Sequence, residues 1–269
     1  MLNIPDIFLL HFFIVSFLGL MAGSFSSALV YRIPRDIPWI IEKKNGKEPK
    51  ACRSACPHCG YRLKFLDLIP FFSWLFLAGK CRSCKRKISV IYPLVELTVM
   101  TAFIAVLFFK GFAPGSIFIF VMIPFLVALL YIDMEHFILP DELVLICAAL
   151  GIGHISLQIF LGSIPVQEAL LFYIGGAFFY SLFLWGMGHL MEKLLKKEAL
   201  GFGDVKLFFV VGLWLGLAKF SLFMLLTGVM GVAFALIWKL FRTEELFPFG
   251  PAIIVSFFSL LFFDGSHFF

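Results

Sequence analysis

Four cysteines form two pairs in the polar segment that follows the first apolar run of the chain. Cys56 and Cys59 make the first pair, Cys81 and Cys84 make the second, and residues 60–80 separate them. A Cys-x-x-Cys turn can direct two thiolates at one ion, and two such turns complete the tetrahedral shell that zinc prefers. The spacing therefore predicts a structural zinc site, because four thiolates leave no open position for a catalytic water.

Disulfide bonds or unliganded thiols are the alternative states of these four cysteines. A reducing cytosol, in which the charge distribution described below places this segment, disfavours disulfides. Cys52 and His58 lie close enough in sequence to replace a ligand, although they are more simply bystanders. Cys147 lies in an apolar run and is predicted to serve packing only.

Two aspartates lie at the ends of apolar runs. Asp133 closes one run in the string IDMEHFILPDEL, and Asp204 opens another in LGFGDVKL. Acidic groups in or beside membrane-spanning segments are energetically costly, which makes each a candidate for function. Two facing carboxylates can share one proton, so that the ionised one activates a water and the protonated one polarises a peptide carbonyl. This pattern indicates aspartyl peptide hydrolysis.

The two glycines that flank Phe202 bear on the second aspartate. Gly201 and Gly203 remove side chains near Asp204, which would allow unusual backbone angles and the close approach of an extended substrate. A G-x-G-D string alone is weakly specific, and its simpler interpretation is a loop-to-helix junction with Asp204 as the N-cap. Glu96 begins a predicted span and is interpreted as a helix-dipole partner or a structural contact.

The composition shows what must position these groups. Of 269 residues, 61% are apolar and 14% are charged, against about 45–50% and about 25% in soluble domains. This excludes a water-soluble globule and makes the bilayer the solvent for most of the chain. Eight apolar runs are candidate membrane spans: 7–31, 94–109, 116–132, 143–161, 169–191, 207–217, 220–238 and 252–263. Lys219 marks either a tight turn between two runs or an interruption of one longer helix, so seven spans remain an alternative.

The basic residues predict the orientation. Fourteen of the 22 Lys and Arg lie between Arg32 and Lys87, and alternation of eight spans would put 20 of them on one side. Lys and Arg in short loops favour the cytoplasmic side, so the cysteine-containing loop is predicted to be cytoplasmic and both termini external. The first run lacks a basic start and is interpreted as a retained signal anchor. Topology and anionic lipids explain the basic loop more simply than nucleic acid does.

Together these features predict an all-α polytopic membrane protein with about eight transmembrane helices and a small zinc-knuckle cytoplasmic domain between the first two. The predicted organisation is a first transmembrane helix, a cytoplasmic zinc-binding domain and a transmembrane core that carries both aspartates, with bounds 1–33, 34–92 and 93–269.

Five motifs in order resemble the type IV prepilin peptidase family, the leader peptidase/N-methyltransferases of the GxGD aspartyl protease class. They are GSFSSALVYRIP (23–34), the two cysteine pairs, SVIYPLVEL (89–97), IDMEHFILPDEL (132–143) and LGFGDVKL (200–207). The resemblance implies that Asp133 and Asp204 are the catalytic pair of an inner-membrane enzyme that cuts basic leaders from prepilins or pseudopilins at the cytoplasmic face. It also implies N-methylation of the new terminus with S-adenosylmethionine, with 34–92 as the methyltransferase region.

The chain departs from the family pattern at LKFLDLIPFFSW (63–74) and at Ser26-Ser27. These departures leave the aspartates intact and bear mainly on methylation, for which no glycine-rich loop after a strand indicates a S-adenosylmethionine site. One rival hypothesis is an ion or proton-coupled transporter that uses the two aspartates. Another is a noncatalytic scaffold whose zinc loop binds a secretion partner. The transporter hypothesis explains the acids but not the cysteine pairs or the GFGD string.

Overall fold

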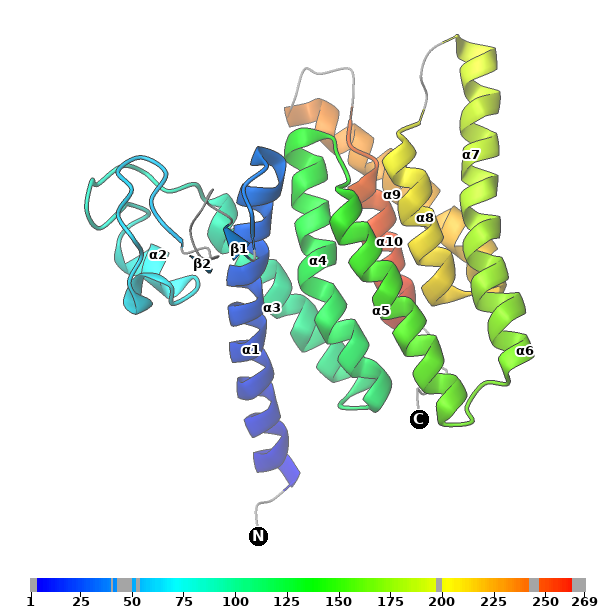
Figure 1. The fold of residues 1–269 in the computed structure, drawn as a ribbon, viewed down its shortest axis with the longest axis horizontal. Helices are drawn as coiled ribbons and strands as arrows, with labels where there is room; N and C mark the ends of the chain where they lie inside the picture. The colour runs from blue at the N-terminus through cyan, green and yellow to red at the C-terminus, as the bar shows by residue number, and fades with distance from the viewer. Residues whose placement is uncertain are drawn as a thin grey trace. The chain divides into compact units, whose positions relative to one another are not determined.

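The computed structural model describes the chain as a set of helices joined by short connections and one small cysteine-containing loop region (Figure 1). It divides into two compact units, Met1–Phe108 and Phe109–Phe269. The residues described are 4–39, 41–42, 50–51, 54–196, 200–241 and 247–262. Cys52, considered above as a substitute ligand, lies outside the described residues.

The first unit contains two long apolar helices with small elements between them. Helix α1 spans Ile4–Arg32 and α3 spans Ile91–Lys110. Between them lie η1 (Ile33–Arg35), the antiparallel strands β1 (Ile41–Glu42) and β2 (Lys50–Ala51), η2 (Phe65–Asp67) and α2 (Phe72–Phe76). Pro34 lies two residues after the last residue of α1, and its fixed φ and missing N–H prevent the α-helix from continuing.

Glycines allow close contact between α1 and α3. A Cβ on Gly23 would lie 2.6 Å from the Cα of Glu96, and one on Gly19 would lie 2.9 Å from the Cα of Met100. Small residues four apart let two membrane helices approach at backbone distance. This contact fixes Glu96 against α1.

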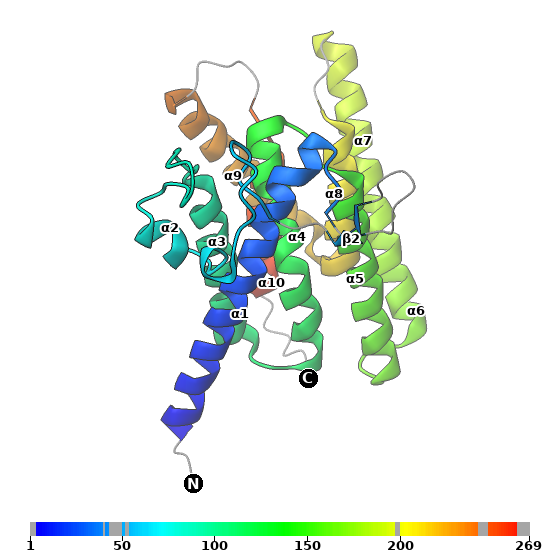
Figure 2. The same cartoon turned by 60° about the vertical axis from the view of Figure 1, so that its left-hand side comes forward.

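The short helix α2 lies beside α1 rather than beyond its C-terminal end. Both views of the ribbon show this placement within the first unit (Figures 1 and 2). The cysteine-containing region, residues 54–90, therefore folds back along the last turns of α1.

The second unit is a helical bundle with α8 (Phe202–Leu215) at its centre. Helix α8 packs on α5 (Asp141–Phe160), α7 (Gly175–Leu195) and α10 (Gly250–Phe262), and α4 (Pro114–His136) packs on α5 and α10. Helix α7 continues from α6 (Val166–Glu168) through a π-helical segment, η3 (Ala169–Ile174). The bundle is completed by η4 (Leu217–Lys219) and α9 (Phe220–Phe241). Buried aromatic and aliphatic side chains from α4, α8 and α10 fill its interior.

Each of the eight apolar runs coincides with a helix, and the mainly helical membrane fold is confirmed. Within the described residues, six helices are long and apolar enough to cross a membrane: α1, α3, α4, α5, α6–α7 and α9. Helices α8 and α10 have 14 and 13 residues, and at about 1.5 Å per residue both fall short of a ~30 Å hydrocarbon core. The number of crossings therefore stays a prediction.

A turn separates the sixth and seventh runs. Gly216 adopts a left-handed φ of 68°, and η4 then carries Lys219 to the start of α9. The interpretation of Lys219 as part of a turn is confirmed, and a single long helix over both runs is wrong.

Candidate active site and cysteine cluster

Asp133 is buried near the C-terminal end of α4, with 6% of its surface exposed. Its Oδ2 accepts a hydrogen bond of 2.9 Å from the N–H of Gly250, the first residue of α10. The apolar residues that precede Asp133 pack α4 against α5 and α10 and so carry the carboxylate into the bundle. Phe137, at a left-handed φ of 56°, ends α4 one turn later.

Gly250 is required for this contact, although the sequence did not point to Gly250 as a residue of the site. A Cβ at this position would lie 2.6 Å from Oδ2 of Asp133, so any side chain would displace the carboxylate. The N–H groups of the first helical turn have no partner within their own helix, which makes them available to an acceptor. Gly250-Pro251 does signal a helix start, but no local pattern reports a partner 117 positions away.

Asp204 lies in the first turn of α8 and is half-buried. Gly201 is the N-cap of the helix, so the interpretation of Asp204 as the N-cap is wrong. Gly201 has φ −72°, and Gly203 is not among the residues with positive φ, so unusual backbone angles do not explain these glycines. Close packing within the chain explains Gly203, and the approach of a substrate to Asp204 stays a prediction. A Cβ on Gly203 would lie 3.1 Å from Cβ of Leu139, in the connection between α4 and α5.

Side-chain contacts hold the start of α8 beside its neighbours. Lys206 forms an ion pair of 2.6 Å with Asp141 in the first turn of α5. Ser181 of α7 donates a hydrogen bond of 3.2 Å to the carbonyl of Val205. Figure 1 shows the end of α4 and the starts of α5, α8 and α10 at the same end of the second unit.

The structure brings the two predicted aspartates together. Asp133 acts electrostatically on Asp204 although 71 positions separate them in sequence. One carboxylate is buried against a backbone amide, and the other is half-buried at a helix start. Such a pair can hold one proton between them and a water that both can reach. Their catalytic role remains a prediction at this point.

The four paired cysteines also come together. Their Sγ atoms lie within 4.8 Å of one another, and those of Cys56 and Cys84 are 3.9 Å apart. All four are free thiols. A tetrahedral centre with metal–sulfur bonds of about 2.3 Å has sulfur–sulfur edges of about 3.8 Å. The cluster could therefore hold a metal ion, and its donor set is the one that zinc prefers.

The two cysteine turns share one backbone conformation. Cys56 and Cys81 each donate their N–H to the carbonyl five residues later, at 2.9 Å, and accept from the N–H four residues later, at 3.0 Å. That fourth position is left-handed in both turns, with φ 68° at Gly60 and 59° at Lys85. Two turns of one geometry face each other, so each contributes its two sulfurs in the same way.

The second turn favours the thiolate form at Cys81, whereas burial and the neighbouring sulfurs raise the pKa of Cys84 to about 11. The backbone N–H groups of Cys84 and Ser83 donate to the sulfur of Cys81 and lower the pKa of Cys81 to about 7. A thiolate, and not a thiol, is the species that binds a metal. The local backbone thus supports the same function as the grouping of the sulfurs.

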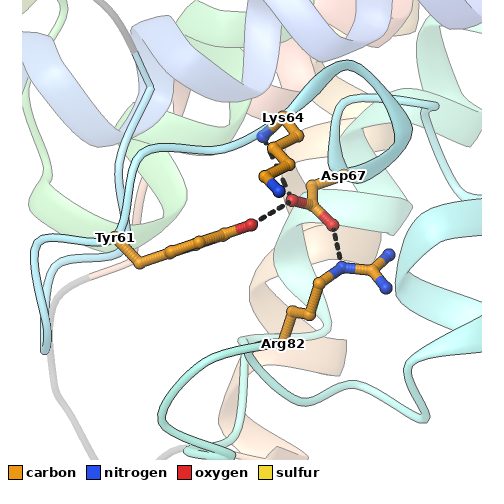
Figure 3. Close-up of polar contacts among 4 residues, drawn as sticks. All are labelled: Tyr61, Lys64, Asp67 and Arg82. Atoms are coloured by element: carbon orange, nitrogen blue, oxygen red, sulfur yellow. Dashed lines mark hydrogen bonds and ion pairs between the residues drawn. The ribbon is translucent and has the colours of Figure 1, made fainter.

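A buried carboxylate joins the two cysteine turns (Figure 3). Asp67 accepts hydrogen bonds from the N–H of Lys64 at 3.1 Å and the hydroxyl of Tyr61 at 3.4 Å, both just after the first turn. Its other oxygen accepts from Nε of Arg82, inside the second turn, at 2.6 Å. Burial alone would raise the pKa of Asp67, but the hydrogen bond and charge of Arg82 and the other donors outweigh it and keep this pKa below its usual value.

The two units thus define a multi-span membrane protein with a pair of interacting acids and a separate four-cysteine loop. Residues 17–110 match the model of the Bacterial Peptidase A24 N-terminal domain, and residues 120–236 match that of the Type IV leader peptidase family. The chain belongs to the type IV leader peptidase family.

Its relatives cover nearly the whole chain. A "Prepilin leader peptidase/N-methyltransferase" of Aeromonas hydrophila is 32% identical over 92% of this chain and 89% of its own length. Proteins of the same name from Pectobacterium carotovorum and Pseudomonas aeruginosa are each 34% identical over 89% of this chain, and over 88% and 86% of their own lengths. No solved structure matches the chain.

Gly250→Ala is expected to lower the thermal unfolding midpoint of the purified protein by roughly 3–10 °C, because the new Cβ displaces the buried carboxylate of Asp133. Gly228→Ala is the matched control, since a Cβ there meets nothing within 4 Å. Equal midpoints for the two variants would show that the Gly250 contact contributes nothing to the fold.

Asp67→Asn should loosen the two cysteine turns, because the amide loses the ion pair with Arg82 and keeps only neutral hydrogen bonds. Limited trypsin digestion of the purified protein should cut between residues 61 and 82 several-fold faster than in the wild type. Asp36→Asn, at an exposed position outside the turns, is the control. An unchanged digestion rate in Asp67→Asn would show that the ion pair with Arg82 does not stabilise the two cysteine turns.

Proposed function

We propose that this protein is a membrane-embedded aspartyl endopeptidase that removes the basic leader from type IV prepilins or pseudopilins and then N-methylates the new terminus. The observation that carries the proposal is the meeting of Asp133 and Asp204 at one end of the second unit, in a chain of the type IV leader peptidase family. The names of its relatives, which join a leader peptidase to an N-methyltransferase, support both halves.

The acid pair is proposed to hydrolyse the peptide bond without a covalent intermediate. The ionised carboxylate takes a proton from a water, and the water oxygen bonds to the scissile carbonyl carbon. The protonated carboxylate hydrogen-bonds to the carbonyl oxygen, and the C–N bond breaks as a proton is delivered to the leaving nitrogen. Gly203 lets the start of α8 pack against the α4–α5 connection, which holds Asp204 close to the end of α4 that carries Asp133.

The acid pair is proposed to face the cytoplasm from the inner membrane. Lys193 and Lys239 lie in the last turns of α7 and α9, and Lys206 lies in the first half of α8. These residues belong to the end of the second unit at which Asp133 and Asp204 meet, and the positive-inside rule assigns that end to the cytoplasm. A basic leader held at the inner leaflet would reach the pair from this side.

The cysteine cluster is proposed to bind a structural Zn²⁺ through Cys56, Cys59, Cys81 and Cys84. Four sulfurs fill a tetrahedral shell, so the ion would contribute folding stability and no chemistry of its own. In this proposal residues 1–33 anchor the chain, 34–92 form the zinc-binding and methyl-transfer region, and 93–269 form the peptidase core.

Membrane lipids are proposed to contact the cysteine-containing region. Phe65 and Phe76 are 80% and 84% exposed. Lys64 directly precedes Phe65, and Lys80 follows four residues after Phe76. Exposed aromatic side chains beside basic ones are typical of segments that lie in the headgroup zone. The position of α2 alongside α1 is consistent with that depth (Figure 2).

A transporter is the less favoured function. Buried acids would also suit an ion or proton path, but transport accounts neither for the four-cysteine cluster nor for the match of residues 120–236 to the leader peptidase model.

Asp133→Asn and Asp204→Asn are each expected to reduce prepilin cleavage by at least about 100-fold, because neither amide can exchange a proton with water or leaving group. Cleavage is measured by mass spectrometry of a prepilin incubated with the purified, reconstituted protein. Glu135→Gln, an exposed acid two residues along α4, is the matched control and should cleave normally. Full cleavage by either Asn variant, or ion flux without any proteolysis by the wild type, would contradict the assignment.

Elemental analysis of the purified protein is expected to find one zinc per chain. Cys56→Ala should lose most of it, because three thiolates and a water hold the ion more weakly. Cys147→Ala, which changes a buried cysteine outside the cluster, should keep it. A wild-type protein free of zinc when prepared without chelators would remove the proposed role of the cluster.

A further inference from the structure

The first unit contains a cavity that the acid pair does not use. It has a volume of about 610 Å³ and is lined by residues of α1, α3, α2 and the two cysteine turns. Sites for small molecules commonly measure about 300–1,000 Å³. All of its lining residues fall between Ser24 and Glu96, whereas both catalytic aspartates belong to the second unit.

Glu96 and Asp67 are the two buried acids in the wall of this cavity, and Asp67 is already paired with Arg82. Glu96 is 8% exposed, and its Oε2 accepts a hydrogen bond of 2.6 Å from the N–H of Phe71. Ser24 of α1 is a second hydrogen-bond partner. A carboxylate held away from water is costly to the fold unless other groups compensate it. The position therefore suggests a function beyond the helix-dipole role that the sequence indicated.

The backbone around Glu96 is arranged to hold it there. Phe71 has a φ of 60° and a ψ of −55°, a backbone conformation that is uncommon for an aromatic residue. Its N–H points to Glu96 in that conformation. On the other side, the absent side chain of Gly23 lets α1 approach the backbone of Glu96. The carboxylate is thus fixed from both α1 and the loop before α2.

The other lining residues combine aromatic rings with basic groups, namely Arg32, Arg82, Arg86 and Lys87. Trp74 offers a ring for stacking and for contact with a sulfonium or ammonium group, and Tyr31, whose ring centroid lies 4.4 Å from the guanidinium of Arg35, offers a second. Arg32 and Arg86 offer guanidinium groups that pair well with a carboxylate. Adenine, sulfonium, ammonium and carboxylate are together the groups of S-adenosylmethionine.

We propose that this cavity binds S-adenosylmethionine together with the newly exposed N-terminus, and that Glu96 binds the terminal amine and accepts its proton. The inference rests on the methyl-transfer half of the proposed function. Glu96 lies five residues into α3, about 8 Å along the helix from Ile91. That depth suits an amine whose own chain continues as an apolar helix in the bilayer.

Glu96 first takes one proton from the terminal ammonium and leaves a neutral amine with a free lone pair. When bound, S-adenosylmethionine supplies the methyl group: a nitrogen–carbon bond forms as the sulfur–carbon bond breaks, and the electron pair of the broken bond stays on sulfur. The methylated nitrogen then carries the positive charge. An ionisable group of the cavity or a water molecule takes one proton from it and leaves a neutral N-methyl amine.

Glu96→Gln separates this role from a purely structural one. Glutamine keeps an oxygen that can accept from Phe71 N–H, but it cannot take a proton. The readout is the ratio of methylated to unmethylated mature product, which is independent of the cleavage rate. We expect this ratio, at a fixed early time, to fall by about 100-fold or more. Asp36→Asn, an exposed acid outside the cavity, should leave it unchanged. A normal ratio in Glu96→Gln would overturn the role of Glu96.

Ultraviolet cross-linking of radiolabelled S-adenosylmethionine to the wild-type protein tests the cavity without relying on turnover. The adduct is expected in peptides from 24–32 or 54–96, and an adduct in 109–269 would overturn the assignment. Ala28→Trp fills the cavity and should reduce cross-linking at least about tenfold. Ala22→Trp, the same change on α1 at a position that does not line the cavity, should not.

The outcomes separate this inference from the function on which it rests. If the wild type methylates but Glu96→Gln and Ala28→Trp do so equally well, the inference fails and the proposed function stands. If the wild type cleaves prepilin but neither methylates nor cross-links, the methyl-transfer half fails and the inference fails with it. Should Ala28→Trp not accumulate, the adduct map of the wild type decides the location alone.

Discussion

The second unit depends on holding two interacting carboxylates at one end of an apolar bundle. Such a pair is costly away from water, so its surroundings must supply backbone amides and water access. Gly250 supplies an amide to Asp133 because α10 begins there. Helix starts are tolerated at membrane depth only where they are buried in protein or line a wet cavity. The shortness of α8 and α10 follows, because both helices begin at the site, below the end of the longer α7 (Figure 1).

The cysteine-containing region of the first unit is held by a different interaction. Between residues 54 and 90 the buried side chains that could act as a core are mainly Cys56 and Cys81. A segment that buries so little apolar surface needs a cross-link, such as a metal site or a buried ion pair, in order to fold. The four-sulfur cluster and the Asp67–Arg82 ion pair both join the first cysteine turn to the second. The region can therefore keep a cavity open at its base, since its stability does not come from filling its interior.

Local patterns in the sequence were sufficient to predict the helices and the grouping of the four cysteines. The same patterns pointed to Asp133 and Asp204, whose catalytic role stays a prediction. Apolar runs and repeated Cys-x-x-Cys spacing can be recognised from residues that are close together in sequence. The contact of Gly250 with Asp133 and that of Phe71 with Glu96 cannot be recognised in this way, because each joins segments that only the packing of helices brings together. The sequence indicated only that Glu96 is a dipole partner or a structural contact, for the same reason: its burial depends on Gly23 of another helix. Length alone also could not show that α8 stops at Gly216.

The two proposed chemistries make different demands, which suits their placement in separate parts of the chain. Peptide hydrolysis needs a water beside the reacting carbonyl, whereas methyl transfer needs a neutral amine as the nucleophile beside the methyl group. The acids proposed for hydrolysis lie at 133 and 204, and the cavity with Glu96 is lined by residues between 24 and 96. Because the two sets share no residue, a substitution in one set can change one reaction without altering the side chains that serve the other. The order of the two reactions follows from the chemistry, since the terminal amine exists only after the peptide bond has been cut.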